Sequence, residues 1–390
     1  VLFLATDGLV KSAQKISNLY GNLPYSIDAS DAYGFSSTLA DVDGDGLKDL
    51  VTGAYVDDDG SSNAGAVYVM FLQTSDCRTL FPTATPVPSS PAPTPRPSTG
   101  IPTGTLVPTG LDCFTDGTVS SAQKISNFYG SMPYSLESSD EFGWSTTSVG
   151  DVDGDGVTDL VVGARLDDDG GTNTGAVYIL FMATDGTVKT SQKISTWGNS
   201  HFDHFYALDD SDYFGGSCAG LGDLNEDGVP DLLVGAFTDD DVYSDSGAVY
   251  ILFLTTDGDV QSAQKISNSY GSLIPYTGYV GASDYFGWSS DSMGDLDGDG
   301  VRDAVVGALY DDDGGSNYGA VYIVFLETNG YVKSAQKISN NYGSFSSFYS
   351  LGSSDYFGSG CAWVSDVDSD GVMDLAVAAG YDDDGGTDSG

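Results

Sequence analysis

Short apolar runs separated by acidic, glycine-containing loops recur along the chain of 390 residues. In one copy, the run 159–164 (DLVVGA) is followed by an acidic turn at 167–171, a second apolar run at 175–181 (GAVYILF) and a more polar segment at 187–195. Runs of this length that are rich in Val, Ile and Tyr are typical of buried strands and are too short for packed helices. Together with a short segment that begins at Phe142, the copy predicts four antiparallel strands, of which the two central ones are apolar.

The same pattern is repeated in phase along the chain. The phrase Asp-x-Asp/Asn-x-Asp-Gly starts at Asp41, Asp151, Asp223, Asp295 and Asp366, with spacings of 110, 72, 72 and 71 residues. A proline-rich insertion at 77–113 accounts for the long first spacing. Five near-equal repeats predict an all-β fold, a single β-propeller over 1–390 with five four-stranded blades. The repeats are expected near 31–76 together with 114–136, 139–209, 211–282, 283–352 and 354–390.

The two ends of the chain match different halves of one repeat. Residues 1–8 resemble 179–186, a third strand and its turn, whereas 386–390 resemble 171–175, which precede that strand. Residues 1 to about 17 are therefore expected to complete the fifth blade. Completion within the same chain closes the ring and is favoured, because five blades in register need no partner. Completion in the next molecule is the alternative, and such head-to-tail contacts generate filaments.

Composition narrows the function classes. The chain has 57 Asp and Glu against 13 Lys and Arg, a formal net charge of -44, and this balance argues against phosphate-mediated binding of nucleic acid. Only four of the acids are Glu, and Asp favours turns over helices, so almost no helix is expected. With 40% hydrophobic residues the chain can form a core, yet no apolar run approaches the ~18 residues of a membrane span.

Several phrases of the repeat resemble a known family. Phe-Gly, an Asp-rich loop, Asp-Leu-Val-Val-Gly-Ala and Gly-Ala-Val-Tyr occur in this order, and the order resembles the FG-GAP repeat of integrin α-chain propellers and related extracellular proteins. The resemblance covers essentially the whole chain outside 77–113 and implies a propeller with calcium loops. Integrin propellers have seven blades, and the Pro of their Gly-Ala-Pro phrase is replaced here by Tyr55, Arg165, Phe237, Leu309 and Gly380.

The acidic loops have the ligand pattern of a calcium site. In 151–159 (DVDGDGVTD), side-chain oxygens fall at positions one, three, five and nine, and position seven can add its backbone carbonyl. Alternating hard oxygens with Gly at position six suit Ca²⁺ better than Mg²⁺. The five expected sets are Asp41, Asp43, Asp45, Leu47 and Asp49; Asp151, Asp153, Asp155, Val157 and Asp159; Asp223, Asn225, Asp227, Val229 and Asp231; Asp295, Asp297, Asp299, Val301 and Asp303; and Asp366, Asp368, Asp370, Val372 and Asp374.

About five Ca²⁺ ions are therefore expected, because four carboxylates in one short loop repel one another without a cation. Solvated Asp-Gly turns without metal are the alternative. Asn225 lowers the charge of the third loop, which is expected to bind calcium most weakly. A second acidic class lies on the opposite rim, at 57–59, 167–169, 239–241, 311–313 and 382–384. These triplets are either weaker cation sites or turns whose side chains cap their own backbone.

The four cysteines divide into two pairs. Cys77 and Cys113 bracket the insertion, where a disulfide would contribute roughly 4 kcal/mol and would indicate an oxidising compartment. Cys218 and Cys361 occupy equivalent positions in two repeats and are expected to be small buried side chains. Nine of the thirteen prolines lie in the insertion with many Ser and Thr, which favours an extended chain that can carry O-linked glycans.

No catalytic arrangement is evident, since the chain has only two histidines and no phosphate loop or zinc spacing. The leading hypothesis is a non-enzymatic, calcium-stabilised structural or adhesion protein, extracellular or at the cell surface, whose partners are copies of itself or another extracellular protein. The alternative is a ligand- or carbohydrate-binding propeller, either a receptor ectodomain or a lectin.

Overall fold

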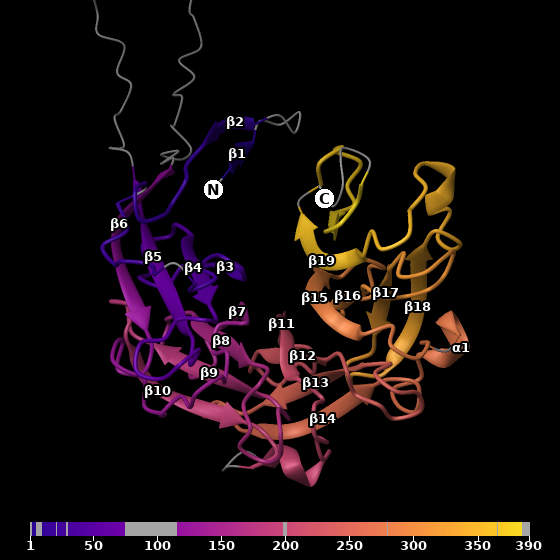
Figure 1. Cartoon of the computed structure of the whole chain (residues 1–390), viewed down its shortest axis with the longest axis horizontal. Coiled ribbons are helices and arrows are strands. Elements are labelled where there is room, and N and C mark those ends of the chain that lie inside the picture. The colour runs from indigo at the N-terminus through magenta and orange to yellow at the C-terminus, as the bar shows by residue number, and fades with distance from the viewer. Residues whose placement is uncertain are drawn as a thin grey trace, which may run out of the picture.

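The computed structural model describes residues 2–4, 10–20, 22–28, 30–74, 115–197, 201–278, 280–364 and 366–383. These residues form an all-β molecule in which the strands are arranged as successive antiparallel sheets (Figure 1). Their only helical elements are α1 (Ile274–Thr277) and the 3-10 turns η1 (His201–His204) and η2 (Phe345–Ser347). The expectation of almost no helix is confirmed for this part of the chain.

Four sheets have four antiparallel strands each. They are β3 (Ser37–Ala40), β4 (Asp49–Ala54), β5 (Ala66–Thr74) and β6 (Thr115–Ile125); β7 (Ser145–Gly150), β8 (Asp159–Ala164), β9 (Ala176–Met182) and β10 (Val188–Ile194); β11 (Phe214–Gly222), β12 (Asp231–Ala236), β13 (Ala248–Leu254) and β14 (Val260–Ile266); and β15 (Phe286–Gly294), β16 (Asp303–Ala308), β17 (Ala320–Leu326) and β18 (Val332–Ser339). The first strand of each sheet lies on the inner side of the arc and packs against the first strand of the next (Figure 1). This arrangement is consistent with propeller blades.

The cores lie between neighbouring sheets. Every residue of β8, β9, β12 and β13 is buried, as expected for the two central strands of a blade. Val161 and Ile179 of the second sheet share one apolar cluster with Val234 and Leu252 of the third. Because strand side chains alternate between faces, the second, third and fourth sheets each bury one face against the sheet before and the other against the sheet after.

A backbone β-bridge joins each sheet to the next one. Gly175 forms an isolated parallel bridge with Phe214 of the next sheet, and a Cβ on Gly175 would lie 2.1 Å from the Phe214 carbonyl oxygen. The same bridge recurs as Gly65 with Phe142, Gly247 with Phe286 and Gly319 with Phe357. The Phe-Gly and Gly-Ala phrases are therefore the two halves of one contact between sheets, and only glycine leaves room for it.

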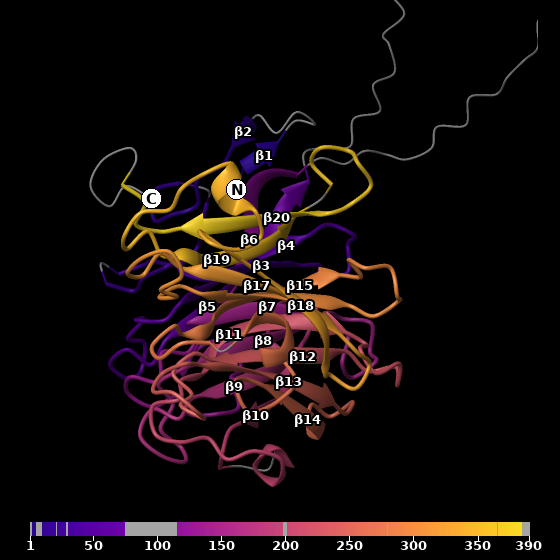
Figure 2. The same ribbon diagram turned by 90° about the vertical axis from the view of Figure 1, so that its right-hand side faces the viewer.

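The closed fifth blade is not present in the described residues. β1 (Leu2–Leu4) pairs with β2 (Val10–Ala13), and β19 (Phe357–Val364) pairs with β20 (Asp374–Ala379), as two separate two-stranded sheets. Both views place these sheets toward the same end of the molecule, and Figure 1 shows them on either side of the opening of the arc (Figures 1 and 2).

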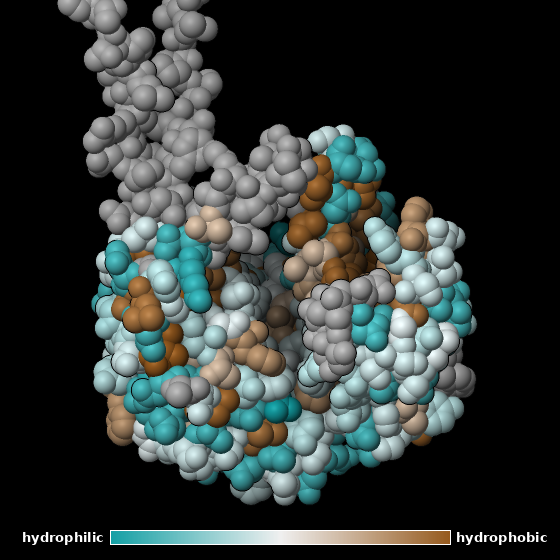
Figure 3. Space-filling model, turned by 45° about the horizontal axis from the view of Figure 1, so that its top comes forward, coloured by the Kyte–Doolittle hydropathy of each residue, from teal (hydrophilic) through white to brown (hydrophobic). Residues whose placement is uncertain are grey.

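The inner half-sheet is left with an uncovered apolar flank. Leu375 and Val377 of β20 are half-buried, whereas every residue of the equivalent strand β16 is buried. They line a cavity of about 480 Å³ together with Val321, Ile338 and Phe345. Figure 3 shows hydrophobic residues gathered at this end of the arc.

Candidate metal loops and the opposite rim

Each predicted calcium loop connects the first and second strands of a sheet and is closed by its own side chains. The two carboxylate oxygens of Asp151 accept hydrogen bonds from the backbone N–H groups of Asp155 and Gly156 at 3.0 and 2.8 Å. Asp153 accepts from Asp155 at 3.1 Å, and Asp155 accepts from Val157 at 3.0 Å. The same pattern of position one to Gly at position six, and of position five to position seven, recurs in all five loops.

The ninth residue ties each loop to the sheet. Asp159 is fully buried and accepts hydrogen bonds from Val152 of the loop and from Met182 at the end of the third strand, both at 2.9 Å. Burial raises the pKa of Asp159 to about 6, as it does for Asp49, and raises the pKa of Asp231 to about 7. A carboxylate held in this way is short of compensating positive charge.

The donor sets fit a hard divalent cation. Three carboxylate oxygens, one from each of three aspartates, lie within 4.8 Å of one another in four loops: Asp41, Asp43 and Asp49; Asp151, Asp153 and Asp159; Asp295, Asp297 and Asp299; and Asp366, Asp368 and Asp374. In the third loop, Asn225 instead donates its side-chain amide to Asp227 at 3.0 Å. Oxygen ligands at this density are those that Ca²⁺ takes. The carbonyl ligands at position seven remain predictions.

On the opposite rim, the second acidic class holds a buried lysine. Lys193 of β10 lies with its Nζ 2.6 Å from Asp167 and 2.5 Å from Asp169, and it is 7% exposed. Tyr178 donates its hydroxyl to Asp167 at 2.9 Å, and the backbone N–H of Asp169 donates to the same residue at 3.2 Å. The acidic turn therefore caps its own backbone, as one of the two alternatives predicted. The positive charge that its carboxylates contact is the ammonium group of Lys193.

The same lysine contact occurs in all four complete sheets, through Lys124, Lys193, Lys265 and Lys337. Although burial lowers the pKa of Lys193, its pairing with Asp167 and Asp169 raises the pKa overall, so the side chain is charged. The sequence analysis missed these residues as partners of the acidic turns. The signal was the phrase Gln-Lys-Ile-Ser, which recurs in each repeat.

A further buried aspartate lies beside each of these turns. Burial, followed by the negative charge of the turn, raises the pKa of Asp140, Asp212 and Asp284 to about 7. Each accepts a hydrogen bond from the backbone N–H three residues earlier, at 2.6 to 2.8 Å. The rim is therefore rich in carboxylates that its few lysines only partly neutralise.

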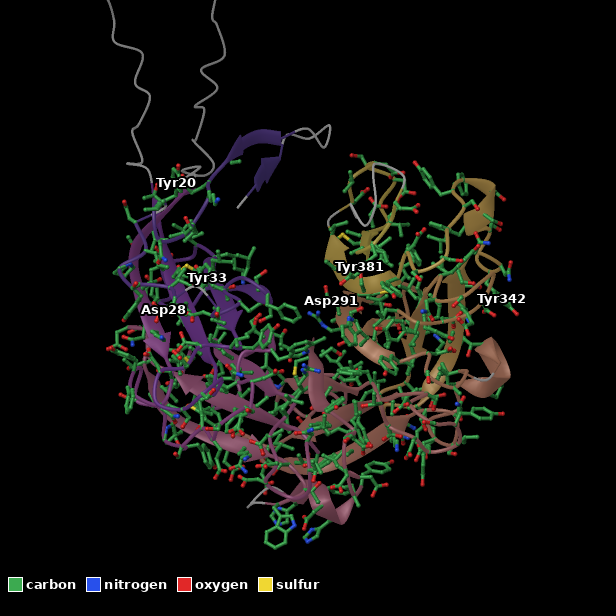
Figure 4. The ribbon with its side chains drawn as sticks, viewed as in Figure 1. Tyr20, Asp28, Tyr33, Asp291, Tyr342 and Tyr381 are labelled. Carbon is green, nitrogen blue, oxygen red and sulfur yellow. The ribbon has the colours of Figure 1, made fainter. Side chains whose placement is uncertain are left out.

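The rim opposite the calcium loops also carries a belt of aromatic rings. Neighbouring centroids along it are 4.4 to 6.4 Å apart, through Phe35, Tyr55, Trp144, Tyr213, Phe237, Tyr285, Trp288, Tyr310, Tyr356 and Tyr381. The Arg165 guanidinium lies 3.5 Å from the Trp144 ring and connects the belt to Tyr213. Trp144 and Trp288 belong to the second and fourth sheets, so the belt crosses the inner side of the arc. Tyr381 lies on that side and Tyr342 on the outer side (Figure 4).

Two cysteines can be placed. Cys218 and Cys361 are unpaired and accept hydrogen bonds from Ser145 and Ser289 of the preceding sheet, both at 3.2 Å. Burial raises the pKa of both thiols to about 12, so they are unreactive. The expectation of small buried side chains is confirmed for Cys218, whereas Cys361 is only half-buried. Cys77, Cys113 and the rest of the insertion lie outside the described residues, as do residues 384–390.

Comparison with known proteins supports the resemblance seen in the sequence. Residues 33–70 and 142–180 match the FG-GAP repeat family. The chain is 29% identical over 280 residues to integrin alpha pat-2 of Caenorhabditis briggsae, a match that covers 68% of this chain and 20% of that protein. It is 36% identical over 174 residues to human integrin alpha-11, covering 43% of this chain and 12% of that protein.

One similar protein is named as an enzyme. The chain is 30% identical over 201 residues to phosphatidylinositol-glycan-specific phospholipase D of Bos taurus, covering 50% of this chain and 21% of that protein. The chain thus spans about a fifth or less of the length of these relatives. None of the helices in the described ranges could span a bilayer.

Proposed function

Because this chain carries FG-GAP repeats, we propose that it is a calcium-stabilised extracellular or cell-surface protein that binds a ligand or mediates adhesion. The observation that carries the proposal is the separation of two surfaces. The calcium loops lie at one rim of the sheets, and the aromatic belt lies at the other. Phe35 and Tyr381 of the belt are 51% and 54% exposed, and aromatic residues are enriched where proteins bind partners.

Ligand binding at the belt is tested with the intact chain on arrays of extracellular-matrix proteins and glycans. We expect the Phe35→Ala, Tyr381→Ala double variant to lose at least tenfold in affinity for the ligand that is retained. Tyr342→Ala, a tyrosine of similar exposure on the outer side, should bind as the wild type does. Equal loss in both variants would exclude the belt as the binding surface. Retention of soluble glycans would favour the lectin alternative over adhesion.

Calcium is proposed to hold the inner strand pair of each sheet together, since the ligands at positions one and nine flank the turn between those strands. Removing calcium with EGTA should lower the melting temperature of the intact chain by well over 5 °C, because ions bound only to the folded state stabilise it by mass action. The measurement is a calorimetric scan with and without 2 mM Ca²⁺, with Mg²⁺ as the matched control. An unchanged melting temperature would rule out calcium stabilisation.

We also propose that the β1–β2 half-sheet completes the sheet of β19 and β20, as the repeat alignment predicts. The pairs Leu2–Ala13, Phe3–Ser12 and Leu4–Val10, with a bulge after Phe3, reproduce the pairs Val324–Ala335, Phe325–Ser334 and Leu326–Val332, with a bulge after Phe325. β1–β2 therefore has the register of the outer half of a blade, and β19–β20 has that of the inner half.

A cross-link distinguishes the possible partners. By alignment with the Ala304–Val324 pair, Leu2 is expected opposite Leu375. Oxidation of the Leu2→Cys, Leu375→Cys variant should give a monomeric disulfide if the ring closes within one chain. Disulfide-linked oligomers would instead show strand exchange and filament growth. Two free thiols after oxidation would refute completion of this sheet by β1–β2.

The remaining proposals concern the insertion and assembly. We propose a Cys77–Cys113 disulfide and O-linked glycans on the Pro, Ser and Thr residues between them, which peptide mapping before and after reduction would detect. Association with copies of the chain, the proposed partner, would appear as particles in light scattering. The chain is proposed to have no enzymatic activity of its own, and hydrolysis of a phosphatidylinositol-glycan substrate by the intact chain would overturn that statement.

A further inference from the structure

Within the described residues, two of the five calcium loops are contacted by a lysine that lies outside the loop. Lys333 of β18 lies with its Nζ 2.6 Å from both Asp297 and Asp299. Lys189 of β10 contacts Asp155 and lies 3.4 Å from Asp153. In both cases the ammonium group sits between the carboxylates of positions three and five, which are two of the predicted metal ligands.

The same strand position is uncharged in the other two complete sheets. The lysines follow Val188 and Val332, the first residues of their strands, and the equivalent residues after Val119 and Val260 are Ser120 and Gln261. Ser120 donates its hydroxyl to the Phe71 carbonyl at 2.9 Å. The second and fourth loops therefore face an ammonium group that the first and third loops do not have.

Other positive groups do not remove this difference. Lys48 and Arg302 stand at position eight of the first and fourth loops, and both are exposed. Neither forms an ion pair with a loop carboxylate within the described ranges of the chain. The charge held against the ligand oxygens is thus set by the residue in the fourth strand.

We propose that Lys189 and Lys333 are internal counter-ions that compete with Ca²⁺, so that the second and fourth loops bind calcium more weakly than the first and keep their shape without it. The inference rests on the proposed calcium function. An ammonium group that contacts two ligand carboxylates must either leave them when the ion binds or stay beside a divalent cation, and each course costs binding free energy. The first loop has four aspartates and no such competitor.

This proposal changes the expected order of the sites. From ligand charge alone, the third loop, which contains Asn225, is expected to have the lowest calcium affinity. With the lysines counted, the second, third and fourth loops each have three uncompensated negative charges at the ligand positions, and the first and fifth loops have four. Among the loops of the four complete sheets, the first loop, which contains Asp41 and Asp49, is therefore expected to fill first as calcium is added.

Competition between the intact chain and a chromophoric chelator measures the site affinities. The Lys189→Gln, Lys333→Gln double variant is expected to bind calcium about tenfold more tightly at two sites, because a unit charge about 5 Å from a divalent ion in water changes its binding by roughly that factor. The Lys189→Arg, Lys333→Arg variant keeps the charge and should bind as the wild type does. In the opposite direction, Ser120→Lys should weaken one site by a similar factor.

Heat stability supplies a second readout. In EGTA, the Gln double variant should melt below the wild type, because its empty loops have lost their counter-ions, and its gain on adding calcium should be larger. Unchanged or weaker calcium affinity in the Gln variant, with calcium still bound, would overturn the role of the lysines and leave the calcium sites standing. If no variant binds calcium, the proposed calcium function itself is wrong.

Discussion

Replacing Gly247 by alanine is expected to destabilise the fold by about 3–5 kcal/mol, since overpacking and left-handed strain each cost about 1–3 kcal/mol. Gly247 has φ +86°, and an added Cβ would lie 2.1 Å from the Phe286 carbonyl oxygen, 2.7 Å from its nitrogen and 2.8 Å from the Phe237 carbonyl oxygen. All three are backbone atoms, so no side chain can move aside. The clash would break the bridge between Gly247 and Phe286 and separate the third sheet from the fourth.

Gly278→Ala is the matched control for this substitution. Gly278 has φ +78°, and a Cβ there would meet nothing within 4 Å. Only the strain of the left-handed backbone is then added, which costs about 1–2 kcal/mol. Urea unfolding at saturating calcium compares the two variants. A similar loss of unfolding free energy at both positions would show that the Gly247–Phe286 bridge between sheets does not contribute to stability.

Replacing Lys265 by methionine is expected to cost about 3–5 kcal/mol, the usual effect of leaving buried charges without their partner. Lys265 is 5% exposed, and its Nζ lies 2.7 Å from Asp239 and 2.8 Å from Asp241. The adjacent carboxyl of Asp212 has a pKa already raised to about 7 by burial and by Asp239. Without the lysine, three neighbouring carboxyl groups would repel one another.

The loss should depend on pH in a defined direction. Carboxyl groups whose folded-state pKa is raised stabilise the fold when protonated, and this contribution is lost as the pH rises through the raised pKa. The Lys265→Met variant should therefore be closer to the wild type at pH 5.5 than at pH 8. Adding Asp239→Asn should restore part of the stability at pH 8. Gln261→Met, an exposed change on the same strand, should alter stability by less than about 0.5 kcal/mol. A pH-independent loss would contradict this account.

Local features of the chain could be predicted from the sequence because they depend on nearby residues. The run 159–164 was predicted as a strand and is β8, with the same boundaries. The acidic loops form through hydrogen bonds between residues two to seven positions apart, such as Asp151 with Gly156 and Asp159 with Val152. Five in-phase copies of such a phrase repeat the same information, and this repetition makes the sheets and the candidate ligands recognisable without a structure.

Only the tertiary structure decided which charged and aromatic groups meet. Lys193 forms an ion pair with Asp169, which lies 24 residues earlier in the sequence. The Trp144 ring packs against that of Trp288, although the second and fourth sheets are not consecutive in the sequence. Lys193 lies on the polar segment 187–195, which forms the edge strand of its sheet, yet its side chain is buried. The arrangement at the fifth sheet was also decided in space, where β1–β2 and β19–β20 form two separate two-stranded sheets. Contacts of this kind depend on how whole sheets pack, because strand periodicity specifies the face of a side chain and not its partner.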